Sequence, residues 1–369
     1  MNRPHVGFYV HYHGLGHKHR AEAIMRHLDC DCTVITSRCG DAAWSGKHLI
    51  DVMDLPSDID DVPDHGYRHR QEVPALHYAP LWTDNITARV AAYTGWLQDA
   101  KPDLMVVDVS AEISMLTRLA SIPQVVVRQH GRRDDDAHHN AYAAAISLLA
   151  PFPESWEDDI TPSWVRQKTI YLNGFRREPE KTPQTIPQHE RPTVVVMFGR
   201  GGHADAHAPL RSAANECPDF QWLVIGLDDD EHHPAGPANL SFLGWQESPQ
   251  DIYRHADVVV TAAGHNSVME IGSYRRPMIA IAQDRPFDEQ IRKARILDRE
   301  GLAVGLSRWP EAGSWPRLLD RARRLDTSQW DRVFQEDGAQ QAASYLTSTA
   351  QWAAKQKRLQ TETSPCPSV

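Results

Sequence analysis

The chain has 369 residues, of which 41% are hydrophobic and 24% are charged, and its formal net charge is −10. This length favours two domains of ordinary size, and the composition is that of a soluble globular protein. The acidic balance argues against DNA or RNA as a partner, because binding to a phosphate backbone requires Lys and Arg clustered over a broad face.

Neither a membrane-spanning segment nor a secretory leader is predicted. No apolar run approaches the roughly 20 residues that cross a bilayer, and the N-terminus leads directly into an apolar strand without a cleavage site. The five cysteines are odd in number and form no repeated CxxC pattern, which argues against a disulfide framework or a structural zinc site. We therefore expect a cytoplasmic protein, for which peripheral contact with a membrane stays open.

The first recognisable unit is an apolar strand, a glycine-rich turn and a helix. The strand is expected over 6–10 and the helix over 21–28, with Gly14 and Gly16 in the turn between them. Such glycines let the backbone turn tightly and approach a ligand at the helix start. The dinucleotide-binding fingerprint is incomplete, because residues 18–20 occupy the place of its third glycine. A nicotinamide-dependent dehydrogenase is therefore disfavoured.

Four histidines surround this turn, namely His11, His13, His17 and His19. Imidazoles at alternate positions can converge on zinc, so a metal site is one interpretation. A binuclear metallohydrolase would carry an aspartate in this turn, and the sequence has none. We expect no bound metal.

A long loop and the ends of two strands in the first half are candidates for a substrate cleft. A second strand is expected over 33–36, and the Pro-rich segment 51–80 reads as a long loop, which in a compact domain is often functional. A strand over 104–108 ends at Asp108, which either caps the next helix or belongs to a site. A strand over 124–128 runs into Gln129 and His130 at the same edge. The acidic runs 134–136 and 228–230 are interpreted as solvated loops.

The second half begins with a strand over 193–198 and the turn Gly199-Arg200-Gly201. Glycine amides and an arginine side chain in such a turn suit phosphate groups. Strands over 221–226 and 240–245 follow, and the second ends at Trp245, whose flat indole suits a heterocycle.

The most informative stretch is 257–290. Its apolar strand breaks at Gly264, and Asn266 and Ser267 are expected to cap the next helix, whose exposed first-turn amides would hold an anion. Glu270 lies within the first two turns, where its carboxylate can accept hydrogen bonds from a diol beside that anion. A strand over 277–282 then delivers residues 288–290 to the same edge. The pattern predicts a site for diphosphate, ribose and sugar.

These residues resemble a known motif. Gly264-x-Asn266-Ser267-x-x-Glu270, followed by Pro277-Met278 and Glu289-Gln290, resembles the donor-binding motif of inverting GT-B glycosyltransferases, both the UDP-glycosyltransferases and the MurG-like enzymes. Two positions depart from the plant-type motif: Ala262 stands in place of a phosphate-contacting histidine, and His265 in place of a tryptophan. The sugar preference therefore cannot be carried over. An ordinary Rossmann-like unit with a solvated Glu270 is the alternative.

The resemblance also assigns chemistry to the first half. Gly14-Leu15-Gly16-His17 is similar to the first-loop signature whose histidine is the general base in many members, and the strand ending at Asp108 is similar to the one that carries its carboxylate partner. A carboxylate on the far imidazole nitrogen would fix the tautomer and stabilise the imidazolium. His13 and His19 remain alternatives to His17, which could instead only cap its helix.

The resemblance implies an α/β GT-B fold with two Rossmann-like domains facing each other across a cleft. We expect an N-terminal acceptor domain over 1–168, a linker over 169–191, a C-terminal donor domain over 192–338, a helix over 339–360 that returns to the first domain, and a frayed tail over 361–369. The expected donor-side residues are Gly16, Gly199, Arg200, Gly201, Trp245, Gly264, His265, Asn266, Ser267, Glu270, Glu289 and Gln290. The expected acceptor-side residues are His13, Gln129 and His130.

The implied activity is transfer of a sugar from a nucleoside-diphosphate sugar, with UDP as the favoured nucleotide, to an acceptor hydroxyl or amine with inversion. No cofactor is expected, since the nucleotide sugar is a co-substrate. The acceptor, whether a small molecule, a lipid-linked group or a glycan, cannot be read from the sequence. A sugar-nucleotide epimerase or a glycosidic phosphorylase of the same fold, and a non-catalytic nucleotide-sugar-binding protein, are the alternatives.

Overall fold

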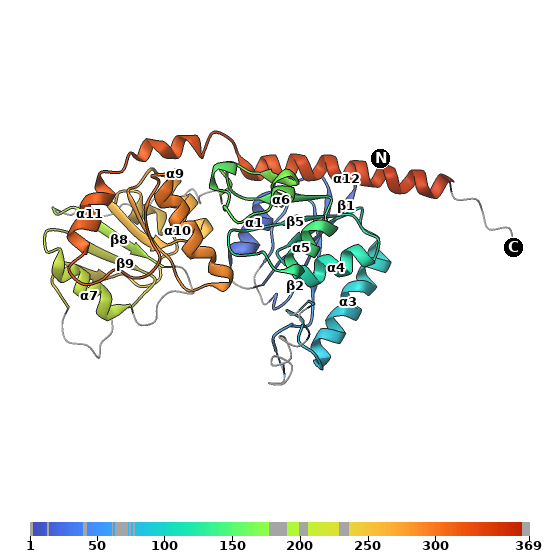
Figure 1. The fold of residues 1–369 in the computed structure, drawn as a ribbon, viewed down its shortest axis with the longest axis horizontal. Coiled ribbons are helices and arrows are strands. Elements are labelled where there is room, and N and C mark those ends of the chain that lie inside the picture. The colour runs from blue at the N-terminus through green and yellow to red at the C-terminus, as the bar shows by residue number, and fades with distance from the viewer. Residues whose placement is uncertain are drawn as a thin grey trace.

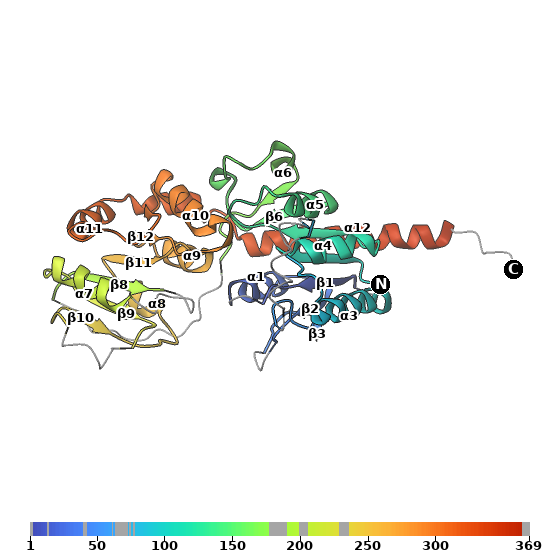
Figure 2. The same ribbon diagram turned by 60° about the horizontal axis from the view of Figure 1, so that its bottom comes forward.

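The computed structural model describes residues 3–12, 15–39, 43–60, 62, 73, 75–76, 78–176, 190–198, 206–228 and 236–363. Two parallel β-sheets, each flanked by helices, form the two halves of an elongated molecule (Figure 1). The long C-terminal helix runs along the first half in both views (Figures 1 and 2). This arrangement confirms the predicted α/β fold with two Rossmann-like domains.

The first sheet has seven parallel strands in the order β3-β2-β1-β4-β5-β6-β7. The strands are β1 (His5–Tyr9), β2 (Asp31–Thr36), β3 (Leu49–Asp54), β4 (Leu104–Asp108), β5 (Gln124–Val127), β6 (Ser147–Ala150) and β7 (Thr169–Tyr171). The helices are α1 (Leu15–Met25), α3 (Asp84–Ala100), α4 (Ala111–Leu119), α5 (Asp136–Ala144) and α6 (Ser163–Gln167), with a 3₁₀ turn, η1 (Glu154–Trp156). The strand order reverses between β1 and β4, and ligands of open parallel sheets bind at the carboxyl edge of such a point.

The second sheet has six strands in the order β10-β9-β8-β11-β12-β13. They are β8 (Thr193–Met197), β9 (Gln221–Ile225), β10 (Leu240–Phe242), β11 (Val258–Ala262), β12 (Met278–Ile281) and β13 (Val304–Leu306). The flanking elements are α7 (His207–Glu216), α8 (Gln250–Tyr253), α9 (His265–Ser273), η2 (Pro286–Asp288), α10 (Glu289–Arg299), α11 (Trp315–Arg323) and η3 (Thr327–Arg332). The strand order of this sheet reverses between β8 and β11.

The two domains share part of one hydrophobic core. Phe152 and Trp156, which follow β6 of the first sheet, belong to the same buried cluster as Val259 and Trp330 of the second half. The rings of Trp156 and Trp330 meet edge to face at 6.1 Å. Asp158 beside them accepts a 2.5 Å hydrogen bond from Arg292 Nη1 of α10. The domains are therefore joined by a packed contact as well as by the linker.

The last helix, α12 (Gly338–Thr363), returns to the first domain, as the sequence predicted. Ala342, Ala343 and Leu346 are buried in one cluster with Val6 of β1 and Ile24 of α1. Tyr345 donates a 2.8 Å hydrogen bond to Ser147 Oγ of β6. None of the helices that the structure describes is both long and apolar enough to cross a membrane. Residues 364–369 of the expected tail lie outside the described part of the chain.

The strands that the sequence predicted are present, with small shifts at their ends. β3, β6 and β7 were not predicted. β3 is an edge strand with a mostly solvated burial pattern, and β7 has only three residues, so neither carries a clear apolar signal. β7 pairs with β6 in the first sheet although its residues fall in the expected linker. Helix α1 begins at Leu15, earlier than the expected 21–28, which brings Gly16 and His17 into its first turn.

Candidate functional site

A cleft of about 910 Å³ lies between the two domains. Its walls are the carboxyl edges of both sheets, and the starts of α1 and α9 face each other across it. A side chain at Gly16 would come within 3.8 Å of Asn266 Nδ2. Pockets for small ligands typically have about 300–1,000 Å³, so this cleft has room for a molecule as large as a nucleotide sugar.

Most of the predicted site residues line this one cleft. They are Gly16, His17, Gln129, Trp245, Gly264, His265, Asn266, Ser267, Glu270, Glu289 and Gln290. Asp108 and His130 are buried behind its wall. His13, Gly199, Arg200 and Gly201 lie outside the described residues, as do 61, 63–72, 74 and 77 of the loop expected to form a cleft wall. Asp58 and Tyr78 of that loop line the cleft.

His17 and Asp108 form a hydrogen-bonded pair. His17 Nδ1 in the first turn of α1 lies 2.6 Å from Asp108 Oδ2 at the end of β4. An ionised carboxylate only accepts hydrogen bonds, so His17 Nδ1 carries the proton and donates it. This tautomer leaves Nε2 as the basic nitrogen of a ring that lines the cleft. The pair can take a proton from a bound molecule.

Arg20 keeps Asp108 ionised. Burial alone would raise the pKa of the Asp108 carboxyl, but Arg20 and then His17 outweigh burial and hold this pKa below its usual range. Arg20 Nη2 lies 3.7 Å from Asp108 Oδ1 and 3.1 Å from His17 Nδ1. Sequence reasoning missed Arg20, although its position one turn after His17 on the same helix was a usable signal.

Asp108 does not cap the helix that follows it. Ser110 does, because its hydroxyl accepts the 3.3 Å hydrogen bond from the backbone N–H of Ile113. Between them Val109 has a left-handed backbone with φ of 57°, which is costly for a β-branched residue and is found mainly at functional sites. This turn aims the Asp108 side chain at His17 and leaves Val109 at the cleft wall.

The other histidines of the first loop have different surroundings. The ring of His11 meets the ring of His17 edge to face at 5.2 Å, and both His11 and His19 line the cleft. Among the described residues, which leave out His13, no group of three or more His, Cys, Asp or Glu is arranged to hold a metal ion.

The start of α9 is built to face an anion. Its cap is Gly264, with φ of −70° and ψ of 146°, and no side chain caps the helix. The expectation that Asn266 and Ser267 cap it is wrong, because the helix begins at His265 and both residues lie inside its first turn. The first-turn amides of this helix therefore point out of the sheet edge at the cleft, where they can hold a negative group.

Glu270 and Trp245 line the cleft on either side of that helix start. Glu270 is in the second turn of α9, and Trp245 follows β10 with 61% of its surface exposed. An exposed indole offers its face to a flat ring, and a carboxylate accepts hydrogen bonds from a pair of hydroxyls. The positions of Glu270 and Trp245 beside the helix start suit a nucleoside that extends from an anion bound there.

Glu289 and Gln290 begin α10 on the same wall. Gln290 is buried, and its side-chain oxygen accepts a 3.0 Å hydrogen bond from the backbone N–H of Gln283. Glu289 Oε2 lies 3.9 Å from Arg133 Nη2 of the opposite domain. Gln290 therefore uses its oxygen to hold the loop after β12, whereas the Glu289 carboxylate faces the cleft and the first domain.

Phe287, which the sequence did not single out, joins the two domains beside Glu289. Its backbone is left-handed with φ of 64°, and its carbonyl accepts a 2.6 Å hydrogen bond from the N–H of Arg132. The Arg133 guanidinium lies 4.6 Å from the centre of its ring, and the His138 ring meets it at 5.0 Å. Gly131 has φ of +119°, and a Cβ there would lie 2.9 Å from the Phe287 oxygen, so glycine is required.

His130 lies behind the cleft wall, contrary to the expected acceptor contact. It is 5% exposed, and its ring stacks on Phe152 with the ring centres 3.9 Å apart. Burial, and next Lys293, lower the pKa of His130 well below its usual value. The side chain of Gln129, one residue earlier, points the other way and accepts a 3.3 Å hydrogen bond from Arg133 Nη2.

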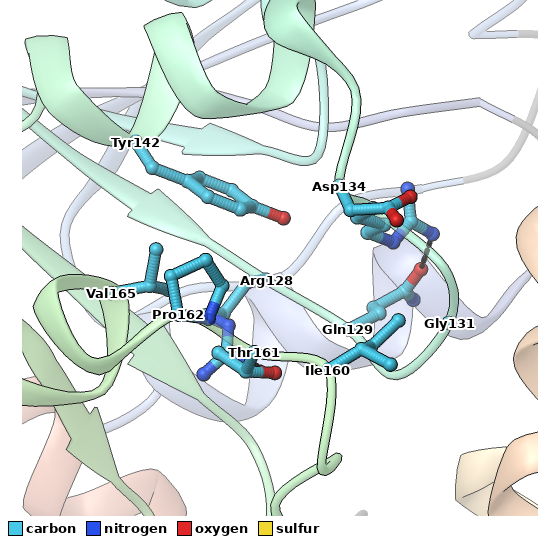
Figure 3. A pocket seen from close by; sticks show the side chains of 10 residues that line it. Arg128, Gln129, Gly131, Asp134, Tyr142, Ile160, Thr161, Pro162 and Val165 are labelled. Carbon is cyan, nitrogen blue, oxygen red and sulfur yellow. Dashed lines mark hydrogen bonds between the residues drawn. The ribbon is translucent and has the colours of Figure 1, made fainter.

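A second, small pocket lies behind the same loop, between Arg128, Gln129, Tyr142, Thr161 and Val165 (Figure 3). Its volume is about 20 Å³, enough for about one water molecule. Arg128 at its floor donates two hydrogen bonds of 2.6 and 2.8 Å to Glu157. This pocket is a structural polar site, too small for a sugar.

Two further cleft residues carry unusual electrostatics. Burial raises the pKa of the Glu112 carboxyl at the start of α4 to about 7. Burial, followed by the hydrogen bond to Asp58, raises the pKa of Tyr12, so its phenol stays protonated. Neither was distinguished by the sequence, where Glu112 reads as an ordinary first-turn acid.

Comparisons with known proteins bear on both domains. Residues 228–309 match the model of the glycosyltransferase family 28 C-terminal domain. An uncharacterized glycosyltransferase of Methanosarcina mazei is 29% identical over 121 residues, which are 32% of this chain and 32% of that protein. The matched segment thus spans about a third of the relative's length.

Solved structures resemble nearly the whole chain. The glycotransferase of kitacinnamycin has a TM-score of 0.66 at 15% identity and covers 97% of this chain and 99% of its own. MurG of Acinetobacter baumannii has a TM-score of 0.65 at 16% identity, and the match covers 95% of this chain and 99% of that one. Spinosyn rhamnosyltransferase SpnG, complexed with thymidine diphosphate, has a TM-score of 0.57 at 14% identity, and the match covers 97% of this chain and 100% of that one. These likenesses confirm the GT-B fold, and with the family match they support the resemblance to GT-B glycosyltransferases.

Proposed function

We propose that this chain, with its family 28 domain and GT-B fold, is a transferase that moves a sugar from a nucleoside-diphosphate sugar to an acceptor hydroxyl or amine. The family match over 228–309 includes α9 and the start of α10, which line the donor side of the cleft. A solved neighbour of the same fold is complexed with thymidine diphosphate. Both facts support a nucleotide sugar as the donor.

The donor would bind with its diphosphate at the uncapped start of α9. First-turn amides stabilise negative charge without a metal ion, since they are fixed, oriented dipoles. Glu270 would accept hydrogen bonds from the ribose hydroxyls, and Trp245 would stack on the base. We propose UDP as the nucleotide and Glu289 and Gln290 as the partners of the sugar hydroxyls.

The acceptor would bind on the first domain, where His17 acts as general base. As the acceptor oxygen attacks the anomeric carbon, its proton passes to His17 Nε2, and Asp108 stabilises the imidazolium that results. The bond to the diphosphate oxygen breaks, and its electron pair stays on the diphosphate facing the α9 amides. A base on one wall and a leaving-group site on the other favour a single displacement, which inverts the anomeric centre.

One observation carries this proposal: His17, which is paired with Asp108, and the uncapped start of α9 line the same cleft from opposite domains. The test begins with the thermal stability of the whole chain in the presence of UDP, TDP and GDP and their sugars. A ligand at 100 times its Kd stabilises the fold by about 2.7 kcal/mol, which raises Tm measurably.

The nucleotide sugar that stabilises the protein is then incubated with a panel of acceptors, and the products are analysed by mass spectrometry and by NMR of the anomeric proton. Two results support the proposal: the wild type transfers the sugar with inversion of the anomeric configuration, and H17Q does not transfer it. An isomerised nucleotide sugar formed without any acceptor would instead identify an epimerase. Failure of every nucleoside diphosphate to bind would refute the donor site.

A further inference from the structure

Lys293 is a buried lysine for which the proposed reaction has so far given no role. It lies on α10, three residues after Gln290, and only 1% of it is exposed. Within the described part of the chain it belongs to no ion pair; its ammonium contacts His265 Nδ1 at 3.0 Å and lies 5.6 Å from the centre of the Trp156 ring. Lysine is almost never fully buried without a charged partner, so this position requires an explanation.

The contact to His265 has a fixed direction. His265 Nε2 lies 3.0 Å from the Phe175 carbonyl, which can only accept, so Nε2 carries the proton and Nδ1 accepts from Lys293. Burial, and then Lys293, lower the pKa of His265 well below its usual value, so the ring stays neutral. His265 is also the first residue of α9 and lines the cleft. The Lys293 amine is therefore one side chain away from the anion site.

The charges around Lys293 come from four elements. Arg20 of α1 and the buried His130 after β5 belong to the first domain, and His265 of α9 and Glu289 of α10 to the second. Burial lowers the pKa of Lys293 to about 7, with Glu289 opposing this shift and Arg20 adding to it. Near neutral pH the side chain is therefore divided between its charged and neutral forms.

Compared with the plant-type motif, the segment before α9 lacks one side chain that can carry a positive charge. Ala262, at the end of β11, stands where the plant-type motif has a phosphate-contacting histidine, and it lines the cleft. A buried ammonium behind the first residue of α9 would supply positive charge to the same place through a medium of low dielectric, where it acts strongly.

We propose that Lys293 is the cation that balances the donor's diphosphate at the start of α9, and that it takes a proton from solvent when the diphosphate binds. The inference rests on the function proposed above. Lys293 contacts His265 and not the ligand, so it is a positioning residue that acts through charge and through the orientation of that ring. When the nucleoside diphosphate leaves, the proton returns to solvent.

The test is titration calorimetry of UDP into the full-length protein at pH 8, in buffers with different enthalpies of ionisation. The number of protons taken up is the slope of the observed enthalpy against the buffer enthalpy. The wild type should take up roughly 0.5–0.9 proton per UDP, because a group with a pKa near 7 is mostly neutral at pH 8. The proton uptake of K293M should be smaller by this amount. The difference in proton uptake between the two proteins is free of the ionisation of UDP itself, which is the same for both.

Two variants separate charge from structure. K293Q keeps a donor for His265 Nδ1 but cannot be protonated, and it should lose both the proton uptake and roughly tenfold to a hundredfold in UDP affinity at pH 7. K168M removes another partly buried lysine, whose ammonium contacts the carbonyls of Tyr142 and Ala143 of α5 and does not line the cleft. It should match the wild type in affinity and in proton count.

The outcomes are distinct. If UDP binds the wild type, K293Q and K293M with equal affinity and equal proton uptake, the inference about Lys293 is overturned and the proposed function stands. If K293Q keeps wild-type affinity while K293M does not, orientation of His265 is the whole effect and the charge role is refuted. If neither UDP nor inorganic pyrophosphate binds the wild type, the donor site and the inference both fail.

Discussion

Replacing Lys293 with methionine should make the free protein more stable at neutral pH. The reason is that the fold displaces the pKa of Lys293 from 10.5 to about 7, whereas in the unfolded chain it returns to its ordinary value. A displacement of this size corresponds to about 5 kcal/mol of unfavourable free energy when the side chain is charged in both states. Methionine fills a similar volume without a charge.

The contacts that K293M removes reduce this stabilisation. His265 Nδ1 loses its donor, at a cost of about 1–3 kcal/mol, and the contact of the ammonium with Trp156 is lost as well. We expect a net stabilisation of roughly 2–3 kcal/mol at pH 7 and below. The sharper quantity is the pH dependence. Between pH 7 and 10.5 the folded lysine is neutral and the unfolded lysine is charged, so the unfolded state binds more protons and the wild type gains stability as pH rises.

The advantage of K293M should therefore shrink by about 1.4 kcal/mol for each pH unit above 7 and should disappear near pH 9. The assay is urea unfolding of both proteins at pH 6, 7, 8 and 9, followed by circular dichroism. K47M, which removes a surface lysine 3.5 Å from Asp29, is the control and should stay within about 0.5 kcal/mol of the wild type throughout. A difference between K293M and wild type that is constant across this pH range would show that Lys293 is not neutralised in the fold, and would refute the reasoning.

Five further variants test the proposed site. H17Q should lower kcat by about 10²–10⁴ and change the Kd of UDP less than threefold by calorimetry; activity close to wild type would exclude His17 as the base. D108N turns an amide N–H toward His17 Nδ1 and favours the wrong tautomer, so kcat should fall while the donor KM stays constant in initial-rate measurements; equal losses in both would indicate misfolding instead. W245A and E270Q should each weaken UDP by roughly 5–150-fold but leave inorganic pyrophosphate unaffected, since it has no base or ribose; weakening of both ligands would contradict these assignments. F287A should raise the donor KM and lower kcat together, because it loosens the contact that holds Arg133 beside Glu289, whereas F220A, away from the cleft, should change neither.

The sequence predicted those parts of the site that depend on local pattern. The strand before Gly264 is a continuous apolar run, and the start of α9, Glu270 and Gln290 follow from it at fixed spacing. The pairing of His17 with Asp108 followed from a resemblance, and the 2.6 Å contact bears out its geometry. Parallel strands bring their carboxyl ends to one edge, so residues at strand ends are the ones that sequence patterns locate well.

What the sequence did not reveal depends on tertiary packing. Whether His130 or Gln129 faces the cleft is decided by the alternation of side chains at the end of β5 and by the position of Phe152. Phe287 reads as a turn residue, and its contacts are all in the other domain. Lys293 was not singled out by the sequence, because the motif does not include Trp156, whose ring lies beside the ammonium. Each of these requires knowledge of how the two domains meet.

The return of α12 has a consequence for how the protein is made. Domains generally fold as units in the order in which they leave the ribosome, but the core around Val6 and Ile24 contains Ala342, Ala343 and Leu346, which are synthesised only after the second domain. The N-terminal domain must therefore wait, with part of its apolar surface uncovered, until the C-terminal domain has been translated. Chaperone dependence and sensitivity to early termination are thus expected to centre on the first domain, although it emerges first.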